Sequence, residues 1–276
     1  MATNIVTLAS PHLLEALESN MVAFWKAYGY PAGRRLDERA DRLCFMTGIP
    51  EPLFNAVLCA HLAPDTVETA VEEIRRDAAQ RNAPLFWWLT PSTTPPELGD
   101  TLVKHGFLHA GTVPGMAVEL ARLDTNLALP RDLTIKVVED NAALDVWASI
   151  AAVGTGFAPL VADMVRALEK DVGLQPANGL RRYVGYLGGV PVAVSGLVLH
   201  AGVAGIFAVA TLPEARKQGI GAAMTLIPLL DALAEGYKVG TLQASEMGYP
   251  VYKRLGFETV CGIGLYLLPL KSQDSE

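Results

Sequence analysis

The segment from Val209 to Thr225, VATLPEARKQGIGAAMT, holds the residues whose types and spacing are best suited to chemistry. Gly219 and Gly221 stand immediately before a helical pattern, and Arg216 and Lys217 lie just upstream. The first backbone N–H groups of a helix have no intrahelical partner and lie at the positive end of its dipole. Glycine lets an anion approach this backbone closely, so the segment predicts a phosphate-binding loop. A glycine-rich turn without a ligand is the alternative interpretation.

The glycine spacing alone does not identify the ligand. The same Gly-x-Gly spacing recurs at Gly154 and Gly156, and again at Gly262 and Gly264. No GxxxxGK[ST] sequence is present, which argues against a P-loop nucleotide site. Met224 stands where a dinucleotide-binding GxGxxG pattern would place its third glycine. Residues outside the glycine pair are therefore needed to decide what the loop binds.

Two further features accompany the loop. A strand-like run and Pro213 precede it, and the downstream sequence PVYKRLGF supplies Tyr252 followed by Gly256 and Phe257. The order of strand, proline, RKQGIG and helix resembles the acetyl-CoA loop, [RQ]xxGx[GA], of the GCN5-related N-acetyltransferase (GNAT) family. By element order the resemblance covers about residues 131–270, and its specific part runs from Val209 to Phe257.

The resemblance implies an α/β fold and a cosubstrate, acetyl-CoA, with no metal. The fold would be a mixed, mostly antiparallel sheet flanked by helices, in which two parallel strands, 205–211 and 239–244, splay apart around the pantetheine arm. Backbone N–H groups from Lys217 to Gly221 would hold the pyrophosphate, and Ser245 stands where many relatives carry an Asn. The residues expected to bind the cofactor are Val209, Thr211, Arg216, Lys217, Gln218, Gly219, Ile220, Gly221 and Ser245.

The resemblance also implies a catalytic role for Tyr252, which matches the position whose hydroxyl protonates the departing thiolate. A buried Tyr with a satisfied hydroxyl is the alternative. The strand sequence GVAGIFAVA has no acid that could serve as general base, so His200, Glu246 or a water molecule remains in that role. The expected activity is transfer of an acetyl group to the primary amine of a small molecule by direct attack. There are two alternatives: a non-catalytic acyl-CoA-binding or regulatory module, and a structural protein without a ligand.

The chain reads as two halves with the same order of elements. LVKHGF in the first half matches YKRLGF in the second, with Phe107 and Phe257 150 residues apart. We expect two tandem domains: residues 1–122, a degenerate GNAT-like copy without the pyrophosphate loop, and residues 131–276, the catalytic copy. The first half lacks the loop glycines and places acidic residues there, which would repel a pyrophosphate: Asp65, Glu68, Glu72 and Glu73.

Local patterns predict several of the elements. Ser10 and Pro11 begin a helix that Gly29 ends, and Pro228 should kink or shorten the helix after Gly219. The stretch from Tyr183 to Pro213 has no charged residue and is long enough to span a bilayer, but its glycines and valines favour short buried strands.

Composition sets the remaining expectations. Of 276 residues, 51% are hydrophobic and 18% charged, which predicts a sizeable core. A net charge of −7 argues against nucleic acid or an anionic membrane as the main partner. Three cysteines without a CxxC spacing indicate neither a disulfide framework nor a zinc site, so we expect a cytoplasmic protein. The oligomeric state stays open, with a homodimer among the expectations.

Overall fold

The chain folds into two compact units, each assembled from two separate segments. The computed structural model describes residues 6–30, 34–126, 128–174 and 179–270. Unit 1 consists of Met1–Ala27 and Pro114–Val260, and unit 2 of Tyr28–Val113 and Cys261–Glu276. The compact units are thus interleaved along the chain and follow other boundaries than the expected consecutive domains 1–122 and 131–276. The point at which two duplicated copies would meet stays a prediction.

Unit 1 is built on a mixed sheet with the strand order β5-β10-β9-β8-β7-β6. Strands β9 and β10 are parallel, and the other neighbouring strands in this order are antiparallel. Its elements in chain order are α1 (Leu13–Lys26), β5 (Leu108–Glu119, from Pro114 onward in this unit), β6 (Leu133–Val137), α4 (Asn141–Thr155), α5 (Pro159–Val172), β7 (Arg181–Leu187), β8 (Val190–His200), β9 (Val203–Thr211), α6 (Ile220–Ala234), β10 (Val239–Gln243), α7 (Tyr249–Arg254) and the start of β11 (Glu258–Leu268).

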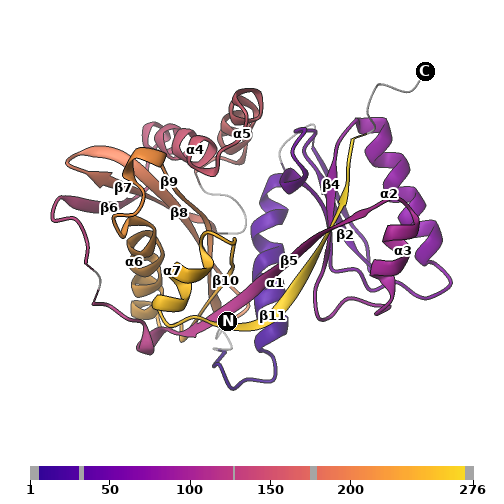
Figure 1. Cartoon of the computed structure of the whole chain (residues 1–276), viewed down its shortest axis with the longest axis horizontal. Coiled ribbons are helices and arrows are strands. Elements are labelled where there is room, and N and C mark those ends of the chain that lie inside the picture. The colour runs from indigo at the N-terminus through magenta and orange to yellow at the C-terminus, as the bar shows by residue number, and fades with distance from the viewer. Residues whose placement is uncertain (1–5, 31–33, 127, 175–178, 271–276) are drawn as a thin grey trace. The chain divides into compact units, whose positions relative to one another are not determined.

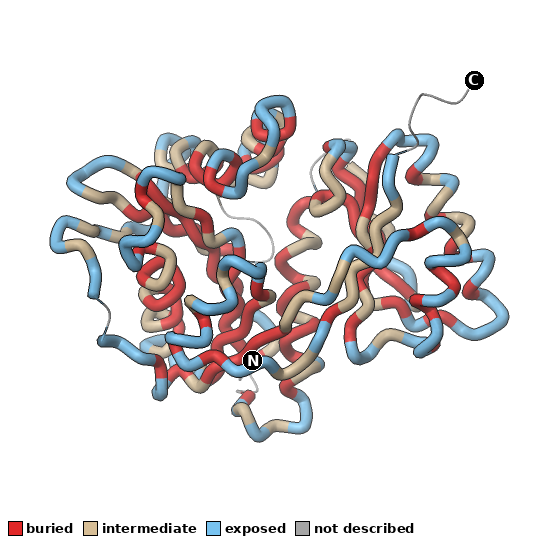
Figure 2. Tube along the Cα trace, in the orientation of Figure 1, coloured by how far each residue is buried: buried red, intermediate tan, exposed pale blue. Residues whose placement is uncertain are grey.

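Helices cover both faces of this sheet, which explains its continuous apolar strands (Figure 1). Ala204 and Ile206 of β9 pack into the cluster that contains the buried face of α6. Val194 and Ala210 pack instead against Trp147 of α4. Strands β8 and β9 are buried along most of their length (Figure 2). The uncharged stretch that could have been a membrane span is therefore sheet, and no helix among the described residues is long and apolar enough to cross a bilayer.

Helix α1, although first in the sequence, belongs to unit 1. Phe24 stacks on Phe207 of β9, with ring centroids 4.2 Å apart. The buried Asn20 donates from Nδ2 to the carbonyls of Val198, His200 and Val203, at 2.9, 3.2 and 3.3 Å. The helix begins at Leu13 rather than at the expected Pro11, and the Ser10 hydroxyl accepts the backbone N–H of His12.

Strands β9 and β10 splay apart soon after they meet, as expected from the sequence. Their parallel pairing consists of Gly240 with Ala204 and Thr241 with Gly205, and stops there. Three residues further on, Ala208 adopts a φ of 49° where the register between β8 and β9 shifts. Two residues of β9 thereby oppose one residue of β8, which is a β-bulge, and it bends β9 beside the opening.

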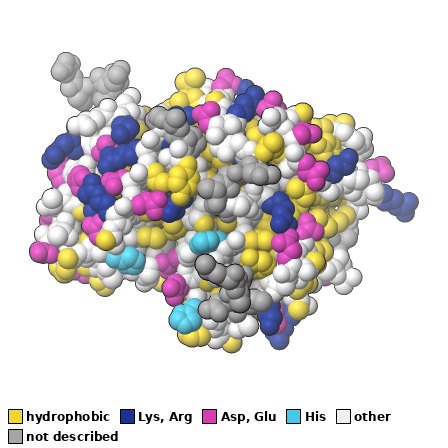
Figure 3. Space-filling view, turned by 180° about the vertical axis from the view of Figure 1, so that it is seen from behind, with side chains coloured by type: hydrophobic (Ala, Val, Ile, Leu, Met, Phe, Trp, Pro, Cys, Tyr) yellow, Lys and Arg dark blue, Asp and Glu magenta, His cyan; other side chains and the backbone are white. Residues whose placement is uncertain are grey.

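Unit 2 is a smaller mixed sheet with the order β1-β2-β3-β4-β11, in which β3 and β4 are parallel. Its elements are β1 (Arg35–Glu38), β2 (Leu43–Met46), β3 (Asn55–Leu58), α2 (Val67–Arg81), β4 (Leu85–Leu89), α3 (Leu98–Lys104), the first part of β5 and most of β11. Trp87 of β4 is fully buried, in one core cluster with residues of α2 and α3. Acidic and basic side chains lie side by side on the surface of this unit (Figure 3), as in the ion pairs of Arg39 and Arg42 with Glu73.

Candidate functional site

A cavity of about 450 Å³ lies in unit 1, between the splayed end of β9, the start of α6 and helix α7. It contains every residue of the expected cofactor site except Gln218. Its lining residues are Gly154, Val209, Ala210, Thr211, Ala215, Arg216, Lys217, Gly219, Ile220, Gly221, Ala222, Ser245, Met247, Gly248, Pro250, Val251, Tyr252 and Arg254. The residues that the sequence singled out, from regions 209–221 and 245–252, thus surround one space.

The loop before α6 has the backbone form that an anion site needs. Lys217 has a φ of 62° and Gly219, the N-cap of α6, a φ of 80°. Positive φ at a lysine is uncommon, and Gly219 has further reason to lack a side chain because a Cβ there would lie 3.0 Å from the Ala128 carbonyl. A Cβ on Gly221 would meet nothing nearer than Thr211 Oγ1 at 4.0 Å, so this glycine borders open space.

The Arg216 side chain holds protein backbone in place. Its Nε donates to the Thr211 carbonyl and its Nη2 to the Gly154 carbonyl, each at 3.0 Å. These bonds join the end of β9, the loop and the last turn of α4. The close approach of α4 to β9 favours glycine at position 154, because a Cβ there would lie 3.0 Å from the Cβ of Ala210. Arg216 therefore lines the cavity while its Nε and Nη2 are already hydrogen-bonded to the protein backbone.

Tyr252 lines the cavity from α7 and is 9% exposed. Burial raises the pKa of Tyr252 to about 12, and the Thr225 hydroxyl partly opposes this. The phenol therefore keeps its proton at any pH near neutrality and is available as a proton donor. Its ring packs near Phe257, with centroids 5.9 Å apart, so the Tyr and Gly-Phe parts of the motif lie together.

Ser245 lies two residues after the end of β10 and stabilises the turn into α7. Its Oγ accepts the backbone N–H of Gly248 at 3.1 Å. A Cβ on Gly248 would come within 2.7 Å of the Tyr252 ring, so this glycine makes room for the phenol. The serine hydroxyl is exposed to the cavity and retains its proton for a further hydrogen bond.

The charges around the cavity favour an anionic ligand. Arg216, Lys217 and Arg254 line it, while none of the described lining residues carries a carboxylate or an imidazole. The N-terminus of α6 adds its dipole and free N–H groups. This basic cavity belongs to a chain whose net charge is −7. Sequence reasoning missed Arg254, although it stands two residues after Tyr252 in the motif.

The two side chains considered as general base lie outside this lining. His200 ends β8 at the turn into β9, where its Nε2 lies 3.1 Å from Ser19 Oγ. Burial, with a smaller effect of the Lys26 ammonium, lowers the pKa of His200. Because β9 runs from Val203 to Thr211, the histidine stands at the opposite end of that strand from the loop. Glu246 is exposed, next to two lining residues.

Unit 2 has a different arrangement at the corresponding strands. Cys59 of unit 2 has a φ of 52° and lies 149 residues before Ala208, so both units carry the same backbone feature. Beyond it the strands stay joined, because Thr94 donates to the Ala60 carbonyl and accepts the Leu62 N–H. These bonds occupy the space between strands that is open in unit 1.

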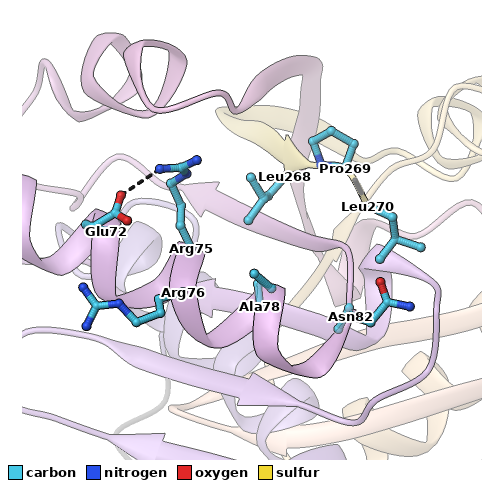
Figure 4. Close-up of a pocket in the computed structure, with 10 residues that line it drawn as sticks. Glu72, Arg75, Arg76, Ala78, Asn82, Leu268, Pro269 and Leu270 are labelled. Atoms are coloured by element: carbon cyan, nitrogen blue, oxygen red, sulfur yellow. Dashed lines mark hydrogen bonds and ion pairs between the residues drawn. The ribbon is translucent and has the colours of Figure 1, made fainter. Parts of the chain in front are cut away.

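A second cavity, of about 300 Å³, lies in unit 2 between α2 and the end of β11 (Figure 4). Arg75 and Arg76 face it from α2, and Leu268 and Leu270 from the other side. Arg75 is paired with Glu72 at 2.7 Å. The cavity has neither a glycine loop nor a helix N-terminus, so it lacks what makes the unit 1 cavity an anion site. No cluster of metal-ligating side chains was found among the described residues of either unit.

Comparison with known families settles what kind of domain surrounds the first cavity. Residues 120–254 match the model of the Acetyltransferase (GNAT) domain. The chain contains a GNAT acetyltransferase domain. The matched residues include β9, the loop, α6, β10 and Tyr252, so the GNAT domain and the cavity coincide. A comparison with curated proteins found no significant match.

Solved structures show the same fold around the GNAT domain. A GCN5-related N-acetyltransferase from Kribbella flavida has a TM-score of 0.68 at 23% identity, over 91% of this chain and 95% of its own. A tandem GNAT protein from the clavulanic acid biosynthesis pathway has a TM-score of 0.59 at 15% identity, over 92% and 88%. A protein from Sphaerobacter thermophilus reaches 0.57 at 14% identity, over 84% and 78%. Both units of this chain are included in these matches, which confirms the expected fold.

Proposed function

We propose that this protein transfers an acetyl group from acetyl-CoA to the amine of a small molecule. The observation that carries the proposal is the cavity itself. It runs from the anion-binding loop at Lys217 to Gly221 to a proton-holding phenol at Tyr252, between strands that separate after Gly205. An elongated cosubstrate with a phosphate-rich end and a reactive thioester end has the chemistry that this arrangement accommodates.

Different residues along the cavity would bind different parts of the cosubstrate. The N–H groups of the loop and the cations Lys217 and Arg254 would hold the pyrophosphate, and backbone groups of Val209 and Thr211 would bond the pantetheine amides. When bound, the thioester supplies the activated acyl group. Tyr252 holds a proton at Oη and delivers it to the departing sulfur, which is general-acid catalysis.

Binding and chemistry are tested separately. Titration calorimetry should show CoA binding to the native protein and loss of binding when Arg216→Gln and Gly219→Val are combined. Gly188→Val is the matched control, because Gly188 also has positive φ, 57°, and lies in the β7–β8 turn outside the cavity lining. CoA affinity that is equal in the double variant and the native protein would refute the proposed site.

Thiol release from acetyl-CoA with a panel of small amines tests the chemistry. Tyr252→Phe should lower kcat by about 10²- to 10⁴-fold, the range for general acid–base catalysis, and leave CoA binding intact. A non-catalytic acyl-CoA-binding module is the second candidate, favoured by the carboxylate-free and imidazole-free lining among the described residues. CoA binding without thiol release for any amine would support that module and overturn the transferase.

We also propose that unit 2 descends from a copy of the same domain that no longer binds the cofactor. The shared positive φ at Cys59 and Ala208, and at Gly106 and Gly256, supports the common origin. Leu102 stands 150 residues before Tyr252, so the phenol has no counterpart there. CoA should bind with a stoichiometry of one per chain, whereas two sites per chain would contradict this interpretation.

A further inference from the structure

Apolar side chains line the part of the cavity around Tyr252. Gly248 lies against the phenol ring, because a Cβ there would be 2.7 Å from it. Met247 and Val251 line the cavity beside this glycine, and Val209 lines it from β9. An apolar environment disfavours the charged form of any group, so the burial that raises the pKa of Tyr252 would lower the pKa of an ammonium placed next to it. An amine at this position is therefore favoured in its neutral form.

Large apolar side chains are also exposed beside this part of the cavity. Met247 is 69% exposed although it belongs to the lining. Val153, which precedes the lining residue Gly154 in α4, is 47% exposed, and Tyr249 at the start of α7 is 37% exposed. An acceptor with an apolar body would cover surface that water otherwise contacts.

Cations outnumber carboxylates on the segments next to the cavity. The titratable side chains of the loop, of α7 and of the turn between β10 and α7 are Glu214, Arg216, Lys217, Glu246, Tyr249, Tyr252, Lys253 and Arg254. The carboxylates of Glu214 and Glu246 are exposed, so solvent and salt screen them. On α4 and α5 three further carboxylates are paired: Asp145 with Lys170, Asp163 with Arg166 and Glu169 with Arg182. A cationic acceptor would thus meet cations, or carboxylates that are screened or already neutralised.

The charge of the acceptor decides whether it can react. Attack on a thioester needs the nitrogen lone pair, which an ammonium ion lacks. An alkylamine with a pKa near that of lysine, about 10, is neutral in only about one molecule in 10³ at pH 7. An arylamine shares its lone pair with the aromatic ring, holds a proton far less strongly, and is neutral at this pH.

We propose that the acceptor is an arylamine, an apolar amine that enters the cavity uncharged. The inference rests on the proposed acyl transfer and names its substrate class. The amine nitrogen attacks the carbonyl carbon and forms the C–N bond, while the C–S bond breaks and its electron pair leaves with sulfur. Sulfur takes the proton of Tyr252 Oη, the nitrogen releases one proton to solvent, and the phenolate regains one from solvent.

Aniline and benzylamine test the proposal, because they are similar in size and differ in charge at pH 7. In calorimetry with the CoA-saturated protein, aniline should bind at least about tenfold more tightly, since benzylamine must first lose its proton. With acetyl-CoA, kcat/KM for aniline should be constant between about pH 6 and 9, because neither aniline nor Tyr252 titrates there, whereas kcat/KM for benzylamine should rise about tenfold per pH unit. Equal or tighter binding of benzylamine at pH 7, or an aniline rate that titrates in this range, would overturn the inference.

A charge variant tests the same selection from the side of the protein. Met247→Glu places a carboxylate beside Tyr252 and should shift the ratio of benzylamine to aniline affinity about fivefold toward benzylamine. Val190→Glu is the matched control, because Val190 is also exposed, at 61%, and begins β8 outside the cavity lining. An unchanged ratio in Met247→Glu would count against the inference. Absence of thiol release with either amine would instead refute the proposed transferase, and the binding ratio would still decide which amine the cavity accepts.

Discussion

Asn20 offers a strict test of how unit 1 is assembled. Its Nδ2 bonds three carbonyls of the β8–β9 hairpin and its side chain is completely buried, so water cannot replace it. Asn20→Leu keeps an apolar side chain at the position and removes the donor. Nδ2 carries two protons, so the three contacts share two donors, and at about 1 kcal/mol for each donor the unfolding free energy of unit 1 should fall by about 2 kcal/mol. For a unit of this size that loss lowers Tm by about 4–8 °C.

The assay should resolve the two units. Native-state hydrogen exchange would show faster exchange in β8 and β9, with amides of β2 and β3 in unit 2 unchanged. Ser19→Ala is the matched control, because Ser19 also reaches the hairpin from α1 but its bond to His200 is exposed. Asn20→Asp tests the direction of the pH dependence. Burial among carbonyls raises the pKa of the introduced carboxyl, so the stability of this variant should fall further as pH rises above about 4. A Tm change below 1 °C in Asn20→Leu would refute the reasoning.

Three further variants test close packing, the loop and pH dependence. Gly205→Ala should destabilise unit 1, because the added Cβ would overlap Asn20 Oδ1 and lie 2.7 Å from the Phe207 ring. In a double-mutant cycle, Asn20→Ala should relieve part of that loss of stability. Arg216→Lys keeps the charge but cannot bridge the Thr211 and Gly154 carbonyls, so calorimetry should show CoA binding weakened about tenfold; native affinity would show that charge suffices. The pKa of Tyr252 is raised to about 12, so with rising pH the phenol ionises in the unfolded chain before it does in the folded protein, and stability falls between about pH 10 and 12. Tyr252→Phe should reduce that fall, as measured by equilibrium unfolding.

The features that sequence could predict are those that local pattern determines. Gly219 and Gly221 before an apolar helix, the splayed strands and the Tyr252 motif were all predicted, and the structure brings them around one cavity. Pro228 was expected to kink or shorten α6, and it does not shorten the helix, which runs on to Ala234. The proline and its neighbours are buried on a packed face, so tertiary burial outweighs the loss of one helical hydrogen bond.

The features that sequence missed depend on contacts between distant residues. Asn20 lies in an ordinary amphipathic helix, and nothing local shows that its carboxamide bonds a hairpin 178 residues later. Arg216 appeared to be a charge for the anion, whereas its contacts with Gly154 require the end of α4 to lie nearby. Strand β1 has no alternation of apolar and polar residues, and its pairing with β2 shows only in the structure.

The interleaving of the two units has a consequence for synthesis on the ribosome. Helix α1 is made first, but its partners in β8 and β9 follow about 180 residues later. At translation rates of about 5–20 residues per second, its apolar face waits for about 10–40 s. Unit 2 waits similarly for β11 to pair with β4. Neither unit can close before nearly the whole chain has emerged, so nascent chains that end before residue 240 should be retained by chaperones or aggregate, in contrast to proteins whose domains fold one after the other.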